Sequence, residues 1–288
     1  MTQLVNINGS LVPGDQPVIG LDNRAYRFGD GLFESIRVIK GMPCFIDAHW
    51  ARLTTGAELL HIKVPATLDR AAFERSIVEL VAANEIESGR CRFTLYRGGS
   101  GNYRPETDEG GFTFELTALS DPTFRLNPQG LMVDIWPEMR KPINELSRHK
   151  TLNCQYYIMA ALWSRQKGLD DCLLQNERGN IIESSSGNLF IVSNGVLYTP
   201  SLADGCLGGV MRAQIIEISR LEALALHFAD RVEDGLVLGL DGDDVLALGT
   251  CVEMAGTLDR EIVGFGGAGG PDDFLGIGID QRLSLIHI

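Results

Sequence analysis

Three residue types with complementary chemistry follow one another in the second half of the chain. Lys150 stands in a polar stretch before a helical pattern, and its amine can form a Schiff base with an aldehyde. Glu183 follows a short apolar stretch, and its carboxylate can pair with a protonated ring nitrogen. Gly208 and Gly209 run directly into another helical pattern, whose first N–H groups and dipole suit a phosphate. An amine, an acid and a helix start in this order are what a protein needs to hold pyridoxal phosphate.

Each of these features also has a plain structural interpretation. A single lysine is normally solvated, a glutamate after a strand can simply end it, and a glycine pair often marks an ordinary loop. The apolar helical pattern beside Lys150 favours the functional interpretation, since a half-buried amine reacts more readily. His49 and Arg52 lie three residues apart on one helical face, which makes Arg52 a candidate for a phosphate contact. Gly249-Thr250, after a buried strand pattern at residues 245–248, is a second candidate of that kind.

Composition narrows the class of protein. The 288 residues suit one large domain or two of ordinary size, and the net charge of −13 argues against nucleic-acid binding. The six cysteines form no CxxC pair, so no metal site is expected. The N-terminus lacks a signal-peptide pattern, and no stretch approaches eighteen apolar residues. We therefore expect a cytoplasmic protein with reduced thiols and no membrane contact.

Hydrophobic periodicity predicts a mixture of hairpins and single helices. The pattern around Asn8-Gly9 predicts a hairpin over residues 5–12. Apolar spacing predicts helices over residues 48–60, 73–81, 151–167 and 210–221. Alternating or continuous apolar runs predict strands over residues 33–39, 92–96, 110–116, 131–136, 171–175, 181–182, 189–192, 196–198 and 245–248. This mixture indicates an α+β fold rather than a doubly wound sheet.

A stretch rich in turn formers divides the chain into two expected domains. Residues 120–130 carry the turn residues and serve as an interdomain loop, so we expect one domain over residues 1–119 and a second, cofactor-binding domain over residues 131–282. The last six residues, 283–288, resemble the translation of a transposon end used in sequencing libraries. We expect them to be a cloning scar on a gene of metagenomic origin, and they are set aside from the fold prediction.

Five motifs in this order resemble the class IV aminotransferases, the fold-type IV pyridoxal-phosphate enzymes. The resemblance runs from about residue 6 to residue 262, and its strength comes from the order, because each motif alone is weak. The motifs are Arg27-Phe28-Gly29-Asp30-Gly31-Leu32-Phe33-Glu34, His49-x-x-Arg52-Leu53, Lys150-x-Leu152-Asn153, Glu183-x5-Leu189-Phe190 and Leu207-x-Gly209-x-x-Arg212.

The resemblance implies a fold and a set of cofactor contacts. It implies two α/β-type domains with the active site between them, in a homodimer whose partner loop helps to close the site. Lys150 looks like the Schiff-base lysine, Glu183 like the partner of the ring nitrogen, and Arg52 like the phosphate-binding arginine. The remaining implied cofactor contacts are Leu207 on the ring and Gly209, Val210, Met211 and Thr250 at the phosphate. Met211 departs from the threonine of some members, so only its N–H could serve there.

The implied reaction is a ping-pong transfer of an amino group between an amino acid or amine and a 2-oxo acid. The substrate side of the site is less specific in sequence. Familiar D-amino acid aminotransferases carry tyrosine where this chain has Phe33 and an Arg-x-His pair that this chain lacks, and familiar branched-chain enzymes read Phe-Glu-Gly where this chain reads Phe33-Glu34-Ser35. The candidates for substrate contacts are Phe33, Arg27, Arg92, Arg97, Arg104 and Cys251.

Two other functions stay open from the sequence. The first is a lyase that releases pyruvate and 4-aminobenzoate from aminodeoxychorismate, because Gly29-Asp30-Gly31-x-Phe33 also occurs in that branch of the family. The second is a protein that holds the cofactor or a partner without turnover, against which the intact Lys150 and Glu183 count. Release of pyruvate without an added keto acid would distinguish the lyase from the transaminase.

Overall fold

The computed structural model describes residues 2–16, 19–120, 130–193, 196–221, 225–229 and 284–287. The chain divides into two compact units. The first unit contains Met1–Pro122 and the short segment His149–Asn153, and the second contains Thr123–Arg148 and Cys154–Ile288. Lys150 therefore belongs to the first unit, although the chain on both sides of its segment belongs to the second. The division into domains at residues 120–130 stays a prediction.

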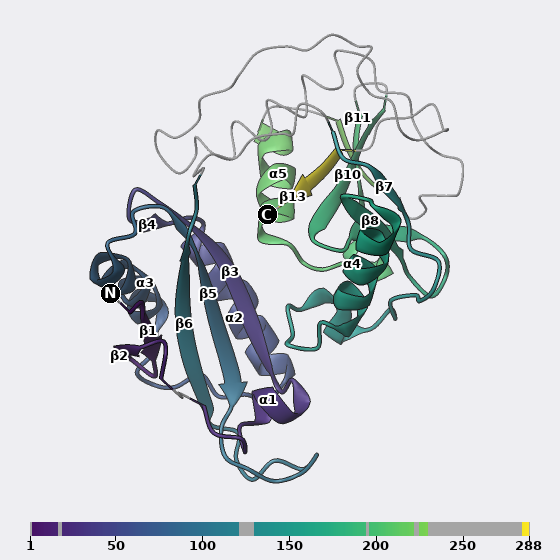
Figure 1. The fold of residues 1–288 in the computed structure, drawn as a ribbon. Helices are drawn as coiled ribbons and strands as arrows, with labels where there is room; N and C mark the ends of the chain where they lie inside the picture. The colour runs from purple at the N-terminus through teal and green to yellow at the C-terminus, as the bar shows by residue number, and fades with distance from the viewer. Residues whose placement is uncertain are drawn as a thin grey trace. The chain divides into compact units, whose positions relative to one another are not determined.

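A six-stranded sheet forms the centre of the first unit (Figure 1). The strand order is β2-β1-β6-β5-β3-β4, and every pairing in it is antiparallel. The strands are β1 (Leu4–Ile7), β2 (Ser10–Pro13), β3 (Gly31–Ile39), β4 (Met42–Pro43), β5 (Gly89–Arg97) and β6 (Gly110–Ala118). The predicted hairpin at Asn8-Gly9 is confirmed, because Ile7 pairs with Ser10 and both turn residues have positive φ.

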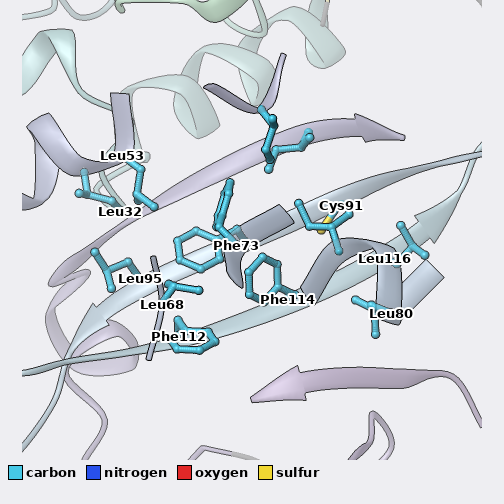
Figure 2. Close-up of a cluster of buried hydrophobic side chains, with 14 of the residues drawn as sticks. Leu32, Leu53, Leu68, Phe73, Leu80, Cys91, Leu95, Phe112, Phe114 and Leu116 are labelled. Atoms are coloured by element: carbon cyan, nitrogen blue, oxygen red, sulfur yellow. The ribbon is translucent and has the colours of Figure 1, made fainter. Parts of the chain in front are cut away.

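Three helices accompany this sheet, namely α1 (Arg24–Phe28), α2 (Ile46–Leu59) and α3 (Arg70–Asn84). The apolar residues of α2 and α3 pack with the buried residues of β3, β5 and β6 into one core (Figure 2). Phe73 of α3 lies at the centre of this core, against Phe93 and Phe114 of the sheet. The predicted helices at residues 48–60 and 73–81 are thus confirmed, with earlier starts than the periodicity indicated. Strand alternation places the buried side chains on the helix-covered face.

The other face of this sheet carries half-exposed side chains. Along β3 and β5 the residues alternate between buried and half-exposed, and Phe33, Ser35, Arg92 and Thr94 share the half-exposed face. The segment around Lys150 adds to this sheet, since Thr151 bridges to Leu32 of β3. The β3 edge thus carries a short piece of backbone from the middle of the chain.

The second unit is built on a mixed seven-stranded sheet. Six strands follow the order β12-β11-β10-β9-β8-β7, and β13 pairs with β10. The strands are β7 (Val133–Ile135), β8 (Asp171–Gln175), β9 (Ile181–Ser184), β10 (Gly187–Ser193), β11 (Val196–Pro200), β12 (Ala225–Ala229) and β13 (Ser284–His287). The β7–β8 and β11–β12 pairings are parallel, and the others are antiparallel. Strand β13 comes from the six residues set aside in the sequence analysis.

Two α-helices of this unit are described, α4 (Gln155–Lys167) and α5 (Val210–Leu221), with the short turns η1 (Glu145–Arg148) and η2 (Leu202–Asp204). The predicted C-terminus of α4 is confirmed, because Gly168 takes the left-handed cap conformation at φ 71°. The predicted start at residue 151 is wrong. Thr151 and Leu152 pair with β3 instead, so the helix can begin only after that pairing ends.

The strand predicted at residues 245–248 lies outside the described residues. Within the described ranges, none of the helices combines the length and apolar character needed to cross a membrane. In the same part of the chain, no three His, Cys, Asp or Glu side chains gather into a group that could hold a metal ion.

Candidate active site

The backbone of Lys150 is fixed to the start of β3. Its carbonyl accepts the Phe33 N–H at 2.9 Å, and the Leu152 N–H donates to the Gly31 carbonyl at 3.0 Å. Gly31 must lack a side chain here, because a Cβ would lie 2.3 Å from the Leu95 carbonyl and 2.9 Å from the Leu152 side chain. The glycine of the motif thus allows the Lys150 segment to lie against the sheet.

Two cations contact the ring of Phe33. The Lys150 Nζ lies 4.6 Å from the ring centroid, and the Arg92 Cζ lies 4.0 Å from it. Arg92 reaches the ring diagonally, since its direct partner across the β3–β5 pairing is Ser35. The structure therefore brings together three of the predicted residues, Lys150, Phe33 and Arg92, on the half-exposed face of the first sheet.

Arg52 contacts a buried carboxylate that the sequence analysis left without a role. Its Nε donates to Glu34 Oε1 at 2.9 Å, and its Nη2 donates to Glu34 Oε2. His49 Nδ1 lies 2.7 Å from the same Oε2. Burial alone would raise the pKa of Glu34, but the charge of Arg52 and the hydrogen bonds from His49 and Arg52 outweigh burial and lower it to about 2. Glu34 therefore holds Arg52 in one orientation on α2.

Arg97 differs from the other candidate arginines. Its guanidinium is buried and donates to Asp30 and Asp108 and to the carbonyls of Leu60 and His61. These contacts give Arg97 a structural use in the first unit. Arg27 and Arg104 are exposed. Of the four candidate arginines, only Arg92 is placed beside Phe33 and Lys150 by the contacts described above.

Glu183 is buried at β9, and both of its carboxylate oxygens accept hydrogen bonds. Lys141 Nζ lies 2.6 Å from Oε1, and the Tyr157 hydroxyl donates to Oε1 at 3.0 Å. The Leu207 N–H donates to Oε2 at 2.8 Å. Burial and the negative charge of Glu183 raise the pKa of Tyr157 far above its ordinary value, so its hydroxyl stays protonated and able to donate.

The glycine pair stands directly before α5, as the sequence analysis predicted. The Gly208 N–H donates to the carbonyl of Arg148, which precedes Lys150 by two residues in the chain. Gly209 lies against Asn188 of β10, where a Cβ would come within 2.0 Å of Asn188 Oδ1. Asn188 is directly opposite Glu183 across the β9–β10 pairing. The acid, the amide and the start of α5 therefore adjoin one another in the second unit.

The residues at the start of α5 fit a phosphate group. The first N–H groups of a helix have no acceptor within the helix, and Val210 and Met211 supply two of them. Asn188 is 94 % buried, and its Nδ2 has no hydrogen-bond partner within the part of the chain that the structure describes. A buried, unused donor beside a helix N-terminus is suited to an anionic oxygen.

The acid at β9 fits the ring of pyridoxal phosphate. A carboxylate offers about four acceptor positions, and Lys141, Tyr157 and Leu207 use three of those on Glu183. One position is left for a ring N–H. The chain thus provides groups suited to both ends of the cofactor. Thr250 and Cys251, predicted at the phosphate and at the substrate, lie outside the described residues.

Five residues of these surroundings, Tyr157 among them, had no role in the sequence analysis. Glu34, His49 and Asn188 stood inside the quoted motifs, and that position was a signal that could have found them. In the fold, Glu34 and His49 lie beside Arg52, or beside its partner, and Asn188 lies beside Gly209. Lys141 had no such signal, because a single lysine in a polar stretch is normally exposed. Only the tertiary fold shows that it is buried.

Comparison with known proteins defines the class to which this fold and these residues belong. Residues 31–232 match the family model for amino-transferase class IV, which covers more than half of the chain. The chain therefore belongs to the class IV aminotransferase family. The predicted α+β fold of fold type IV is confirmed.

Two relatives span most of the chain. A putative branched-chain-amino-acid aminotransferase of Methanocaldococcus jannaschii is 26% identical over 253 residues, which cover 87% of this chain and 85% of the relative. A D-alanine aminotransferase of Bacillus licheniformis is 24% identical over 270 residues, which cover 92% of each chain. The two relatives differ in the amino acid that their names specify, although both are aminotransferases.

A solved structure supports the fold. The branched-chain aminotransferase of Thermoproteus uzoniensis, crystallised with norvaline, superposes with a TM-score of 0.77 at 22% identity. The match covers 88% of this chain and 95% of that structure. At this identity the likeness concerns the fold alone.

Proposed function

We propose that the protein is a pyridoxal-phosphate-dependent transaminase that moves an amino group between an amino acid or amine and a 2-oxo acid. The observation that carries this proposal is the grouping of Glu183, Asn188 and the start of α5. In this grouping a buried acid stands opposite a buried amide with an unused donor, beside a helix N-terminus. Family membership supports the same conclusion.

Bound pyridoxal phosphate would supply an electron-withdrawing ring and an aldehyde that reacts with amines. In the proposal, Glu183 accepts a hydrogen bond from the ring nitrogen, and Leu207 packs on the ring. Gly209, Asn188 and the N–H groups of Val210 and Met211 bind the phosphate, and Arg52 adds a charge-assisted contact to it.

Lys150 has two roles in the proposal. Its Nζ would be the amine that holds the cofactor covalently, and as a free amine the same Nζ would be the group that takes up a proton from the substrate α-carbon. Phe33 lies beside Lys150 Nζ and offers an apolar surface at this point.

Arg92 is our candidate for the substrate carboxylate. It lies over the same ring as Lys150, so a carboxylate bound to Arg92 would leave the substrate α-carbon near the amine. Substrates with a carboxylate beside the reacting carbon, amino acids and 2-oxo acids, fit this placement. We propose amino acids as donors, and the choice between branched-chain acids and D-alanine is left to the measurement below.

The test combines a donor panel with mapping of the attached cofactor. L- and D-amino acids and both enantiomers of 1-phenylethylamine are supplied with pyruvate or 2-oxoglutarate, and transfer to the keto acid is measured. Borohydride reduction of the loaded protein, followed by peptide mass mapping, is expected to place the cofactor on the peptide with Lys150. Lys150→Ala should abolish both transfer and labelling, whereas the exposed Lys167→Ala should retain both.

The outcomes separate the competing functions. Full transfer activity in Lys150→Ala would refute the assignment of the amine. Pyruvate released from aminodeoxychorismate without an added keto acid would identify a lyase instead. A protein that is labelled at Lys150 but converts no member of either panel would hold the cofactor without turnover. We further propose a homodimer in the cytoplasm, which sedimentation equilibrium and fractionation test directly.

A further inference from the structure

Lys141 is a buried cation to which neither the sequence motifs nor the proposed reaction assigns a role. We propose that Lys141 is a positioning residue that keeps the Glu183 carboxylate ionised and, together with Tyr157, fixes its Oε1 so that the Oε2 edge beside the Leu207 N–H faces the cofactor ring. This inference rests on the proposed function for its ring contact. Its first part, the charge state of Glu183, concerns the cofactor-free protein.

Three separate elements converge on the Lys141 ammonium group. Its Nζ donates to the Ser147 carbonyl in η1 at 2.9 Å, to the Tyr157 hydroxyl on α4 at 2.7 Å and to Glu183 Oε1 on β9 at 2.6 Å. An ammonium group has three donors, so these contacts use all of them. The group is completely satisfied inside the protein, which marks it as a built feature rather than a surface lysine turned inward.

The backbone of Lys141 is fixed as well. The Lys141 N–H donates to the Gln175 carbonyl at 2.8 Å, and the Lys141 carbonyl accepts a hydrogen bond from the Glu177 N–H at 3.0 Å. These two hydrogen bonds form a parallel bridge between Lys141 and Asn176. These contacts join Lys141 to the end of β8, and β8 pairs directly with β9, with Leu174 opposite Glu183. Both ends of the ion pair therefore stand on neighbouring parts of one sheet, so the distance between them is set by the fold.

Burial makes the pairing necessary for an ionised acid. The side chains of Lys141 and Glu183 are each only 5 % exposed. A carboxylate this deep in the protein is strongly disfavoured without a counter-ion and would take up a proton instead. The cation of Lys141 removes this tendency, so Glu183 is already charged before any cofactor binds.

The two carboxylate oxygens of Glu183 accept different numbers of hydrogen bonds. Oε1 accepts both Lys141 and the Tyr157 hydroxyl, while Oε2 accepts the single Leu207 N–H. The oxygen with the unused acceptor position is therefore Oε2. Because Leu207 precedes the glycine pair and α5, this edge of the acid is also the one next to the proposed phosphate contacts.

The other titratable groups that act electrostatically on Tyr157 or Cys206 beside the pair are the thiols of Cys206 and Cys154, the carboxyl of Asp204 and the guanidinium of Arg212. Burial raises the pKa of the Cys206 thiol to about 11, so it is neutral near physiological pH. Lys141 is the only cation that donates to Glu183 among the contacts of the described residues. Removing its charge should therefore change the protonation of this acid directly.

The first arm of the test uses the cofactor-free protein. Lys141→Met should gain an infrared band of a protonated carboxyl group at neutral pH, and Lys141→Met combined with Glu183→Gln should lose that band. Because the unpaired acid binds a proton more tightly when folded than when unfolded, the variant's loss of stability should be larger near pH 8 than near pH 5. Lys63→Met, which breaks the exposed pair with Glu109, is the matched control and should show neither effect.

The second arm measures binding of pyridoxal phosphate by equilibrium dialysis. Lys141→Met should weaken binding by at least about tenfold, because a protonated or misplaced acid no longer accepts from the ring. Lys141→Arg, which keeps the charge, should recover part of this loss. Tyr157→Phe removes one donor to Oε1 without a change of charge, so it should weaken binding less and produce no protonated-carboxyl band.

Each outcome decides the inference. Absence of the carboxyl band in folded Lys141→Met, or unchanged binding in that variant, overturns it. Where Lys141→Met fails to fold, Glu183→Gln replaces it: Lys141 is then an unpaired buried cation, and the destabilisation relative to wild type should shrink as pH rises, so a pH-independent difference overturns the pairing. Wild-type protein that binds no pyridoxal phosphate refutes the proposed function and the ring contact, while the infrared arm still decides the charge of Glu183.

Discussion

Two buried acids, one in each compact unit, are each held by a cation and a second polar group. Glu34 is surrounded by Arg52 and His49, and Glu183 by Lys141 and Tyr157. Glu34 orients Arg52, which is proposed to contact the cofactor. Glu183 is itself proposed to contact the cofactor. The cations therefore act through the acids, and a charge removed at either place should alter a neighbouring contact as well as stability.

The pH dependence of stability is the expected signature of Glu34. Its pKa is lowered to about 2, so its contribution is present above the ordinary value of 4.5 and is lost as pH falls through about 2. The shift corresponds to at most about 3 kcal/mol of unfolding free energy. Glu34→Gln should remove this part of the slope in urea unfolding measured between about pH 5 and pH 2. An unchanged slope in the variant would show that the ion pair contributes nothing to acid stability.

At the scale of elements, the start of α5 depends on the fit between Gly209 and Asn188. Gly209→Ala would place a Cβ 2.0 Å from Asn188 Oδ1, and we expect a loss of about 1–3 kcal/mol in unfolding free energy. Asn188→Ala removes the obstacle, so the double variant should recover most of that stability. Urea unfolding of the two single variants and the double variant measures the coupling.

The same pair should respond differently in cofactor binding. Asn188→Ala deletes the unused donor, so it should weaken binding of pyridoxal phosphate while changing stability little. The double variant should then regain stability without regaining affinity. If the double variant recovers both, Asn188 serves packing alone and has no part in holding the phosphate.

The elements themselves were largely predictable from sequence, because the apolar periods and turn residues are local signals. The hairpin at Asn8-Gly9, α3, α5 and the Gly168 end of α4 agree with the patterns. The start of α4 was not predictable, since the Lys150 carbonyl and the Leu152 N–H bond to the start of β3, more than a hundred residues earlier in the chain. A pattern within one segment carries no information about such a distant partner.

Part of the candidate site could likewise be predicted from the sequence, and part could not. Lys150, Glu183 and the glycine pair could be proposed from the sequence because the residue types that the proposed chemistry needs are rare in that order. The burial of Lys141 could not be found, because it results from contacts with Ser147, Tyr157 and Glu183 that only the folded chain brings together. The structure also distinguishes Arg97 from Arg92, which look alike in sequence, by the partners of each guanidinium.

At the scale of the whole molecule, the path of the chain is the main feature. The chain leaves the first unit after residue 122, returns to it for His149–Asn153 and leaves it again. This five-residue return carries Lys150, while Glu183 and the start of α5 stay in the second unit. Of the residues that the proposed function assigns to the cofactor, Arg52 and Lys150 lie in the first unit and Glu183 and Gly209 in the second.

Thermal unfolding of the two units should consequently become coupled when the cofactor is present. A ligand at about one hundred times its Kd stabilises the folded state by about 2.7 kcal/mol. A ligand that needs both units for binding is released when either unit unfolds, so its binding free energy stabilises both units. Calorimetry should show transitions that move upward together with pyridoxal phosphate. Arg52→Met in the first unit and Asn188→Ala in the second should each reduce the shift of both transitions, whereas the exposed control Lys63→Met should not. A shift confined to one transition would place the whole binding site within one unit.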